Sequence, residues 1–291
     1  MIDTTQQTFD ATSHKVEVSD GLTIHYNEAG SGDKVLIALH GSGPGVSGWS
    51  NFKGNLPVFA EHFRTLLVDQ PGFGWSDKPE IREATFTFCA RAVRDLMDKL
   101  GIDKADFLGN SFGGGTAVRF ALDYPERAGK LVLMGAGGIA HVVFAPDPTE
   151  GMKVLREFFA PPGPTKEKLE RFVRVMVWDQ KLVTPELIEE RWNTINDPET
   201  LAGFVRTANP DPEIARQFRE EQELWRYMER IDNEILMIWG RDDRVVPLDA
   251  AFLALKRLRH SRLHVFARCG HWAQVEKRDE FNRLVVDFLA H

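Results

Sequence analysis

A serine enclosed by glycines is the residue of this 291-residue chain that is best placed to do chemistry. The run Gly109-Asn110-Ser111-Phe112-Gly113 lies between a short apolar segment and a helix-like one. That context is typical of a nucleophile elbow, in which the flanking glycines leave room for a strained turn that exposes the serine hydroxyl. A phosphate-binding loop is disfavoured because the run lacks the Lys and Ser/Thr of that motif. We predict that Ser111 is a nucleophile.

A serine hydroxyl is a weak nucleophile at neutral pH and needs an adjacent base. Of the nine histidines, His271 stands in a late loop directly after a predicted strand. Behind a serine elbow of this kind, the acid and then the histidine follow along the chain. Asp242 and Asp243 both follow the preceding strand, and their distance from its end favours Asp243, with Asp242 as the alternative. The acid would hold His271 in the correct tautomer.

The negative charge that develops during attack on a carbonyl needs backbone N–H donors. One is expected from Phe112, the residue after the nucleophile. The other is expected from the run His40-Gly41-Ser42-Gly43, and we assign it to Ser42. His40 itself is expected to be structural. The chain contains no group of His, Asp and Glu with metal-ligand spacing, so neither a metal nor another cofactor is expected.

The elements that position these residues can be predicted from the hydrophobic pattern. Strand-like segments at 22–27, 34–39, 65–68, 105–108, 130–134, 234–239 and 262–266 alternate with helix-like ones at 87–100, 116–122, 248–258 and from 275 onward. This alternation predicts an α/β fold with a mostly parallel sheet flanked by helices. Between the two halves lie Pro-rich turns and amphipathic segments without a clear strand, the best helix candidates being 166–177, 185–192 and 214–228. We predict a core of residues 1–138 and 231–291 that carries an inserted helical cap of residues 139–230.

Composition excludes several classes of protein. The net charge of −7 and pI near 5.8 give no basic footprint for nucleic acid. No apolar run approaches the ~18 residues that a membrane span needs, and the N-terminus lacks the basic start and apolar core of a signal peptide. The two cysteines, Cys89 and Cys269, do not make a disulfide scaffold. We expect a cytoplasmic protein that binds neither nucleic acid nor a membrane.

Several longer segments carry a resemblance to a known family. They are HGSGPGVSGWSNF (40–52), DQPGFGWSDKP (69–79), LGNSFGGGTAVRFALDYPERAGKLVLMGAGG (108–138), FAPDPTEGMK (144–153), DQKLVTPELIEERW (179–192), WGRDDRVVPLD (239–249) and HVFARCGHWAQVEK (264–277). In this order they resemble the meta-cleavage-product hydrolases, which have the α/β-hydrolase fold and cleave carbon–carbon bonds in aromatic and steroid-ring degradation. The likeness covers nearly the whole chain, cap included. Within the family it is greatest to the member acting on a seco-steroid dienoate, and next to the biphenyl-pathway member.

The resemblance implies a substrate and residues that bind it. The substrate would be a 2-hydroxy-6-oxo-hexa-2,4-dienoate, cleaved after dienol-to-keto tautomerisation into a 2-hydroxypenta-2,4-dienoate and a carboxylic acid. Arg191 matches the arginine that holds the substrate carboxylate, a task that suits a bidentate guanidinium. The other matched substrate-binding positions are Ser42, Gly43, Asn51, Asn110, Lys181 and Trp272. Relatives also lead us to expect a homo-oligomer: a dimer, tetramer or octamer.

Plainer interpretations stand beside these. Arg191 follows two glutamates on an amphipathic helix and would equally suit a solvated ion pair, Trp272 would suit a core and Asn110 a turn. Lys181 stands where relatives carry a small polar residue. A carboxylesterase with the same triad and a slow-turnover ligand receptor are the alternative functions. The C6 substituent of the substrate stays open, with apolar cap residues as candidates to line its pocket: Phe158, Phe159, Phe172, Val173 and Trp192.

Overall fold

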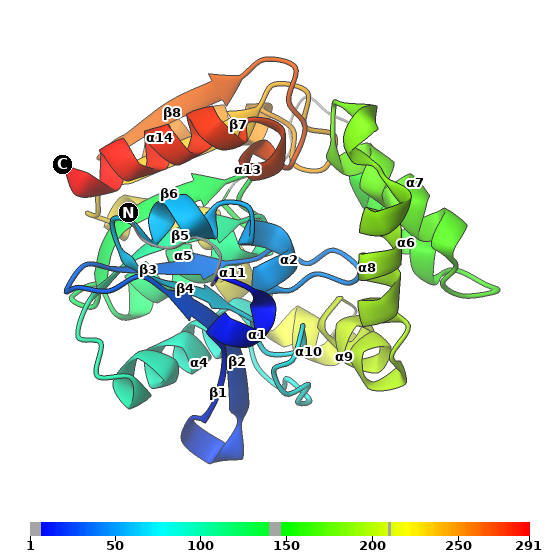
Figure 1. Ribbon diagram of the computed structural model, residues 1–291, viewed down its shortest axis with the longest axis horizontal. Helices are drawn as coiled ribbons and strands as arrows, with labels where there is room; N and C mark the ends of the chain where they lie inside the picture. The colour runs from blue at the N-terminus through cyan, green and yellow to red at the C-terminus, as the bar shows by residue number, and fades with distance from the viewer. Residues whose placement is uncertain (1–6, 140–146, 209–210) are drawn as a thin grey trace.

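A twisted eight-stranded sheet forms the centre of the computed structural model, which describes residues 7–139, 147–208 and 211–291 (Figure 1). The strand order is β1-β2-β4-β3-β5-β6-β7-β8. The strands are β1 (Ser13–Glu17), β2 (Thr23–Ala29), β3 (Val35–Leu39), β4 (Arg64–Val68), β5 (Ala105–Asn110), β6 (Ala128–Met134), β7 (Ile235–Gly240) and β8 (Ser261–Phe266). Strands β3 to β8 run parallel to one another. At one edge, β2 pairs antiparallel with both β4 and β1. The predicted mostly parallel sheet is confirmed, and β1 is an addition that was not predicted.

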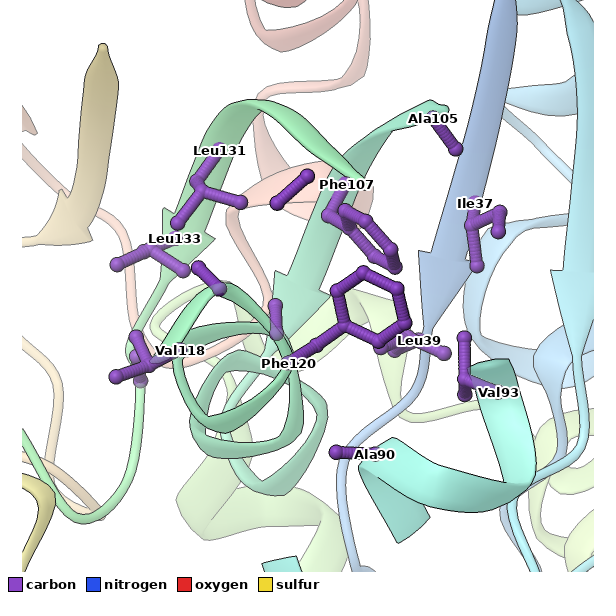
Figure 2. Close-up of a cluster of buried hydrophobic side chains, with 14 of the residues drawn as sticks. Ile37, Leu39, Ala90, Val93, Ala105, Phe107, Val118, Phe120, Leu131 and Leu133 are labelled. Carbon is purple, nitrogen blue, oxygen red and sulfur yellow. The ribbon is translucent and has the colours of Figure 1, made fainter. Parts of the chain in front are cut away.

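Helices cover both faces of this sheet. On one face lie α4 (Thr85–Lys99), α5 (Phe112–Asp123) and α12 (Asp249–Arg257); on the other lie α2 (Gly48–Phe52), α3 (Leu56–Phe59), α13 (Ala273–Glu276) and α14 (Arg278–Ala290). Figure 2 shows Val118 and Phe120 of α5 against Phe107 and Leu131 of the sheet. In β3 the side chains alternate between the two faces: Ile37 and Leu39 belong to one apolar cluster, Leu36 and Ala38 to the other. That two-sided burial explains the continuous apolar run in the sequence.

The carboxyl ends of the parallel strands gather the residues that were predicted to do chemistry. β3 ends directly before His40, and β5 ends directly before Ser111. β7 ends three residues before Asp243, and β8 ends five residues before His271. In open α/β sheets ligands bind at this edge of the sheet. The topology alone therefore brings residues separated by more than 200 positions to one side of the molecule.

A helical segment without strands, among the described residues 147–208 and 211–230, gathers beside that edge (Figure 1). It consists of α6 (Glu150–Phe159), α7 (Lys166–Met176), the 3-10 turn η3 (Gln180–Leu182), α8 (Pro185–Ile195), α9 (Pro198–Ala208), α10 (Pro212–Gln217), α11 (Arg219–Gln222) and the 3-10 helix η4 (Leu224–Arg230). Two short N-terminal pieces, α1 (Phe9–Thr12) and η2 (Ser19–Gly21), complete the described elements. None of the helices in the described residues is long and apolar enough to cross a membrane.

The single helix predicted at 214–228 is wrong. The chain leaves helical geometry at Glu223, and the last turn tightens into η4. The reason is packing: Leu224 and Met228 are fully buried in the apolar cluster on the sheet, and Trp225 donates its backbone N–H to Gly138 O, outside any helix. Because these residues pack with the core, they favour an end of the cap before residue 224. The cap boundaries of 139 and 230 stay a prediction.

Candidate active site

Ser111 occupies a strained turn between β5 and α5. Its backbone has φ 50° and ψ −112°, in the left-handed region that a side chain other than glycine adopts only at a cost of about 1–3 kcal/mol. A Cβ added to Gly109 would lie 2.5 Å from the Cα of Gly114, and one on Gly113 would lie 2.2 Å from Leu39 O. Both flanking glycines are therefore required by contact with neighbouring backbone. The turn is held to β6 by the Ser111 N–H, which donates to Met134 O over 2.8 Å.

His271 and Asp243 form a buried pair beside this turn. The His271 Nδ1 lies 2.7 Å from Asp243 Oδ2, and the two residues are 3% and 7% exposed. The other carboxylate oxygen, Oδ1, accepts the backbone N–H groups of Val245 and Val246 at 2.8 and 3.0 Å. An acceptor at Nδ1 assigns the proton to that nitrogen and leaves Nε2 free to take a proton from a hydroxyl. This is the arrangement that a general base needs.

The neighbouring acid lies in different surroundings. Asp242 is half-buried, with its carboxylate 3.3 Å from the guanidinium of Arg241. It also accepts the backbone N–H of Cys269 at 3.4 Å. The geometry therefore brings Asp243, and not Asp242, to His271.

Ser111 and His271 line the same cavity, but no hydrogen bond joins their side chains in the structure. Within the described part of the chain, no hydrogen bond uses the Ser111 hydroxyl. Such contacts commonly tighten only when substrate binds. The position of the histidine is fixed by its backbone instead, since its N–H donates to Met176 O of α7 over 2.7 Å. The helical segment thus contributes directly to where His271 lies.

The two residues predicted to stabilise an oxyanion both lie at this cavity. Ser42 and Phe112 both line it, and none of the hydrogen bonds between described residues uses either N–H. Phe112 is also the first residue of α5, so the positive end of the helix dipole lies beside Ser111. His40 has a structural environment: its Nδ1 lies 2.6 Å from Gly41 O, its Nε2 accepts the Gln70 N–H, and burial lowers the pKa of the ring.

The cavity has a volume of about 240 Å³. Of the predicted substrate-binding residues it is lined by Ser42, Gly43, Asn51, Asn110, Arg191 and Trp272. The remaining lining is mainly apolar: Val46, Phe86, Phe112, Met152, Leu155, Phe172, Met176, Val245 and Val246. Of the apolar cap residues proposed from sequence, Phe172 lines the cavity, whereas Phe158, Phe159, Val173 and Trp192 pack in the cluster behind it.

Arg191 of α8 is buried at the wall of the cavity, with 3% of its surface exposed. Its Cζ lies 4.5 Å from the centroid of the Trp272 ring, and its Nη1 donates to Pro44 O at 3.0 Å. Burial lowers the pKa of the guanidinium to about 10, which leaves it charged at neutral pH. No carboxylate of the described residues forms an ion pair with it, and its Nε has no partner. The Nδ2 of Asn51, also at the cavity, is likewise unpartnered.

The backbone of Arg191 packs on Gly45, a residue that the sequence analysis did not identify as part of the site. Gly45 has φ +68°, and a Cβ there would lie 2.2 Å from the carbonyl oxygen of Arg191. The backbone of α8 therefore lies directly on the loop that carries Ser42. Beside it, Lys53 and Glu190 form an ion pair of 2.6 Å between core and helix. The sequence signal for the contact at Gly45 is the pair Pro44-Gly45, which is typical of a turn but does not say what packs on it.

Lys181 is a correction. The resemblance placed it among the substrate-binding residues, but its side chain is exposed and it does not line the cavity. It lies in η3, where the Asp179 side chain accepts its backbone N–H over 3.1 Å. The backbone N–H of Asp179 in turn donates to Glu276. We therefore leave Lys181 out of the site.

The described residues contain no group of three or more His, Cys, Asp or Glu side chains placed to hold a metal ion. Cys89 and Cys269 are both buried and free. Burial raises the pKa of each thiol, so neither is a reactive thiolate at neutral pH.

Comparison with known proteins agrees with this geometry. Residues 34–278 match the family model described as alpha/beta hydrolase fold. The chain is 46% identical to a 2-hydroxy-6-oxo-6-phenylhexa-2,4-dienoate hydrolase of Comamonas testosteroni, covering 94% of this chain and 93% of that protein. It is 44% identical to a 2-hydroxy-6-oxononadienedioate/2-hydroxy-6-oxononatrienedioate hydrolase of Paraburkholderia phymatum, covering 99% of both.

A solved structure gives the same result. The meta-cleavage product hydrolase from Pseudomonas fluorescens superposes with a TM-score of 0.82 at 34% identity, covering 95% of this chain and 97% of that one. The greater likeness to the seco-steroid member stays a prediction. The match of fold, length and sequence leads to one assignment: the chain belongs to the meta-cleavage-product hydrolases of the α/β-hydrolase family.

Proposed function

We propose that this enzyme hydrolyses the C5–C6 bond of a 2-hydroxy-6-oxo-hexa-2,4-dienoate. One water is consumed, and the products are a 2-hydroxypenta-2,4-dienoate, or its substituted analogue, and the carboxylic acid formed from C6. Two relatives at 46% and 44% identity carry names for reactions of this kind. Ser111, His271 and Asp243 are the proposed catalytic residues.

One observation carries the proposal: a buried guanidinium without a carboxylate partner. Arg191 lies at the same cavity as Ser111, and neither its Nε nor the Nδ2 of Asn51 has a hydrogen-bond partner among the residues that the structure describes. A buried charge without a counter-charge is costly, so such a site is built for an anionic ligand. Stacking of Arg191 on Trp272 holds the plane of the guanidinium in place for a carboxylate. A simple esterase acting on neutral esters has no use for this arrangement.

The proposed reaction uses residues of this cavity in four steps. The dienol first becomes the keto form, with C5 taking a proton for which His271 is the available acid–base group. Ser111 then attacks the C6 carbonyl and gives its proton to His271 Nε2, while the oxyanion rests on the N–H groups of Ser42 and Phe112. The C5–C6 bond breaks and its electron pair moves through the conjugated chain to the C2 oxygen, which takes the proton from His271. The 2-hydroxypenta-2,4-dienoate leaves, an acyl-enzyme remains, and His271 is again a base. Water deprotonated by His271 releases the acid.

The test compares Arg191→Gln with the unchanged enzyme on two substrates. For a dienoate, followed by loss of its visible absorbance, we expect kcat/KM to fall about 10²–10³-fold, because the substrate carboxylate loses its buried partner. For a neutral p-nitrophenyl ester the fall should be much smaller. An equal fall on both substrates, or rapid ester turnover with no dienoate turnover, would contradict carbon–carbon hydrolysis and favour a carboxylesterase. Arg191→Lys, which keeps the charge but not the fork, should lie between the two.

Assembly is a separate proposal. We carry forward the expectation of a homo-oligomer, which rests on the family alone. Light scattering on the purified protein would give the mass as a multiple of the 33.0 kDa chain. A mass of one chain would contradict it.

A further inference from the structure

The lining of the cavity includes residues in contact with Arg191 and a group of apolar side chains without a charge. Among the described residues that line the cavity, the basic side chains are Arg191 and His271, and none is acidic. Arg191 lies against the Ser42–Gly45 loop, since a Cβ on Gly43 would lie 3.7 Å from its Nη1. The other wall, from Phe86 and Phe112 to Met152, Leu155, Val245 and Val246, has only apolar side chains.

Apart from Phe112, whose N–H is left for the oxyanion, four lining residues near the apolar side chains have backbone N–H groups that are already used. Val245 and Val246 give their N–H groups to Asp243 Oδ1. Gly137 donates to Ser111 O over 2.9 Å, and Gly151 donates to Arg244 O over 3.0 Å. These bonds belong to the triad and to the seat of α6, so a ligand cannot take them over without disturbing the site. An anion placed here would meet neither a free N–H from these four residues nor, among the described residues that line this part of the cavity, a cationic side chain.

Arg244, which directly follows Asp243 in the chain, is committed elsewhere. Arg244 does not line the cavity. Its guanidinium lies 3.2 Å from Glu150 at one end and donates to Arg174 O over 2.6 Å at the other. It therefore ties α6 and α7 to the loop of Asp243 and does not serve as a counter-charge for a ligand.

The shape of this wall also points to a particular group. The rings of Phe86 and Phe112 stack with centroids 5.3 Å apart at 29°, and Phe73 packs against Phe112 from behind at 5.8 Å. The cavity of about 240 Å³ lies below the roughly 300–1,000 Å³ of pockets for drug-sized ligands. A flat ring fits such a wall, and little volume remains for a second fused ring.

We propose that the C6 substituent of this enzyme's substrate is uncharged, compact and flat, an aryl group and not a chain that ends in a second carboxylate. This rests on the proposed carbon–carbon hydrolysis and adds to it which of two substrate classes the chain takes. The relatives that it matches bear names of both classes, 6-phenylhexadienoate and nonadienedioate. The carboxylate at C1 is held by Arg191, and a second carboxylate would be buried against the apolar wall without a partner, which is strongly unfavourable.

The experiment measures kcat/KM for 2-hydroxy-6-oxo-6-phenylhexa-2,4-dienoate and for 2-hydroxy-6-oxononadienedioate with the purified full chain. We expect the phenyl substrate to be favoured by about 100-fold or more. Equal rates, or a preference for the dioate, would overturn the inference while leaving carbon–carbon hydrolysis intact. Loss of both dienoates with retained ester cleavage would remove the proposed function and the inference with it.

A matched pair of variants tests the reason. Met152 lies on α6 at the apolar wall and is 38% exposed, so a polar substitution there should not prevent folding. Met152→Lys supplies a cation, and we expect kcat/KM for the dioate to rise about tenfold relative to the phenyl substrate. Met152→Gln, of similar length and uncharged, should leave the ratio near that of the unchanged enzyme. A ratio that shifts equally in both variants would show that charge is not what excludes the dioate.

A third substrate tests size. A dienoate with a bicyclic C6 group should have a kcat/KM at least about tenfold below that of the phenyl compound, because the wall has no room for the second ring. Turnover of the bicyclic compound as fast as the phenyl one would overturn the compact part of the inference and favour the steroid-type substrate.

Discussion

Two triplets of Ser, His and Asp, each with a buried His–Asp contact, occur in the described residues, and one of them lies at the cavity. In the first, His271 Nδ1 is 2.7 Å from Asp243 Oδ2, and Ser111 shares their cavity. In the second, His25 Nδ1 is 2.9 Å from Asp69 Oδ2, and His25 Nε2 is 2.8 Å from the hydroxyl of Ser13. The second triplet has the more complete set of hydrogen bonds, because its serine and histidine are already in contact.

The surroundings separate the two. His25 is 1% exposed, stacked on the ring of Phe9 at 5.5 Å and packed against Trp75 at 5.3 Å. Ser13 lies on β1, paired with Asn27 of β2, and has neither a strained turn nor a helix N-terminus beside it. None of the three residues lines the cavity of Ser111. A Ser-His-Asp contact therefore does not make an active site without the turn, the free N–H donors and room for a substrate.

The second triplet, Ser13, His25 and Asp69, has a structural role. Asp69 accepts the backbone N–H of Gly48 at 2.6 Å and that of Trp75 at 2.8 Å. It joins the antiparallel edge of the sheet to the start of α2, the helix that carries Asn51 to the cavity. The same three residue types thus hold a sheet edge in place at one site and are proposed to do chemistry at the other.

The largest effect should separate the two serines. Ser111→Ala should lower kcat for a dienoate by about 10⁶-fold, because the nucleophile is lost. Ser13→Ala should leave kcat within about twofold of the unchanged enzyme. Stopped-flow absorbance measures both, with circular dichroism as the check on folding. A large loss from Ser13→Ala in a folded protein would break the comparison.

The two aspartates should differ in kind. Asp243→Asn should lower kcat by about 10⁴-fold with a modest change in stability, because His271 loses the acceptor that selects its tautomer. Asp69→Asn should instead cost about 2–4 kcal/mol of the free energy of unfolding, since it weakens a buried cluster of three contacts. Urea unfolding and steady-state kinetics on both variants decide this. Two variants with the same pattern of losses would contradict the distinction.

A smaller effect should come from the residue that anchors the loop of His271. The carboxylate of Glu276 accepts the N–H groups of Trp178 and Asp179 from the helical segment and of Gly270 from the histidine loop. Glu276→Gln should lower kcat about tenfold with little change in KM, since His271 loses its alignment. A KM effect alone would contradict a positioning role.

Glu276 also gives a pH dependence with a definite sign. Burial raises its pKa above the ordinary value of 4.5, so the folded protein binds this proton more tightly than the unfolded chain does. Its contribution to stability is therefore largest at low pH and is lost as the pH rises from 4.5 through the raised pKa. Urea unfolding at pH values from 4.5 upward should show that the free energy of unfolding falls with rising pH in the unchanged enzyme. In Glu276→Gln the fall should be weaker. A slope of opposite sign from this residue would contradict the assignment.

The smallest effect should be the loss of protein stability when the serine of the second triplet is removed. Ser13→Ala removes one half-buried hydrogen bond to His25 and should lower the free energy of unfolding by about 0.5–1.5 kcal/mol. Thermal unfolding should shift by a few degrees at most. No shift would mean that the 2.8 Å contact contributes nothing to holding β1 on the sheet.

The sequence by itself determined what depends on local geometry. The glycines around Ser111 are needed by contacts within a few residues and with one neighbouring strand, so their spacing predicts the turn. The alternation of apolar runs predicted seven of the eight strands, whereas β1, half-exposed at the edge, has no apolar run to reveal it. The order of Ser111, Asp243 and His271 follows from the order of the strands that precede them.

Tertiary structure alone decided the rest. Only packing distinguishes Lys181, which points to solvent, from Arg191, whose backbone lies on Gly45 from a loop 146 positions earlier. Only packing breaks the periodic segment 214–228 so that Leu224 and Met228 reach the core. Only packing shows that Ser13, His25 and Asp69, distant in sequence, meet under an aromatic cover. The reason is common to all three: which way a side chain faces depends on what distant segments place against it, and spacing along one segment does not contain that information.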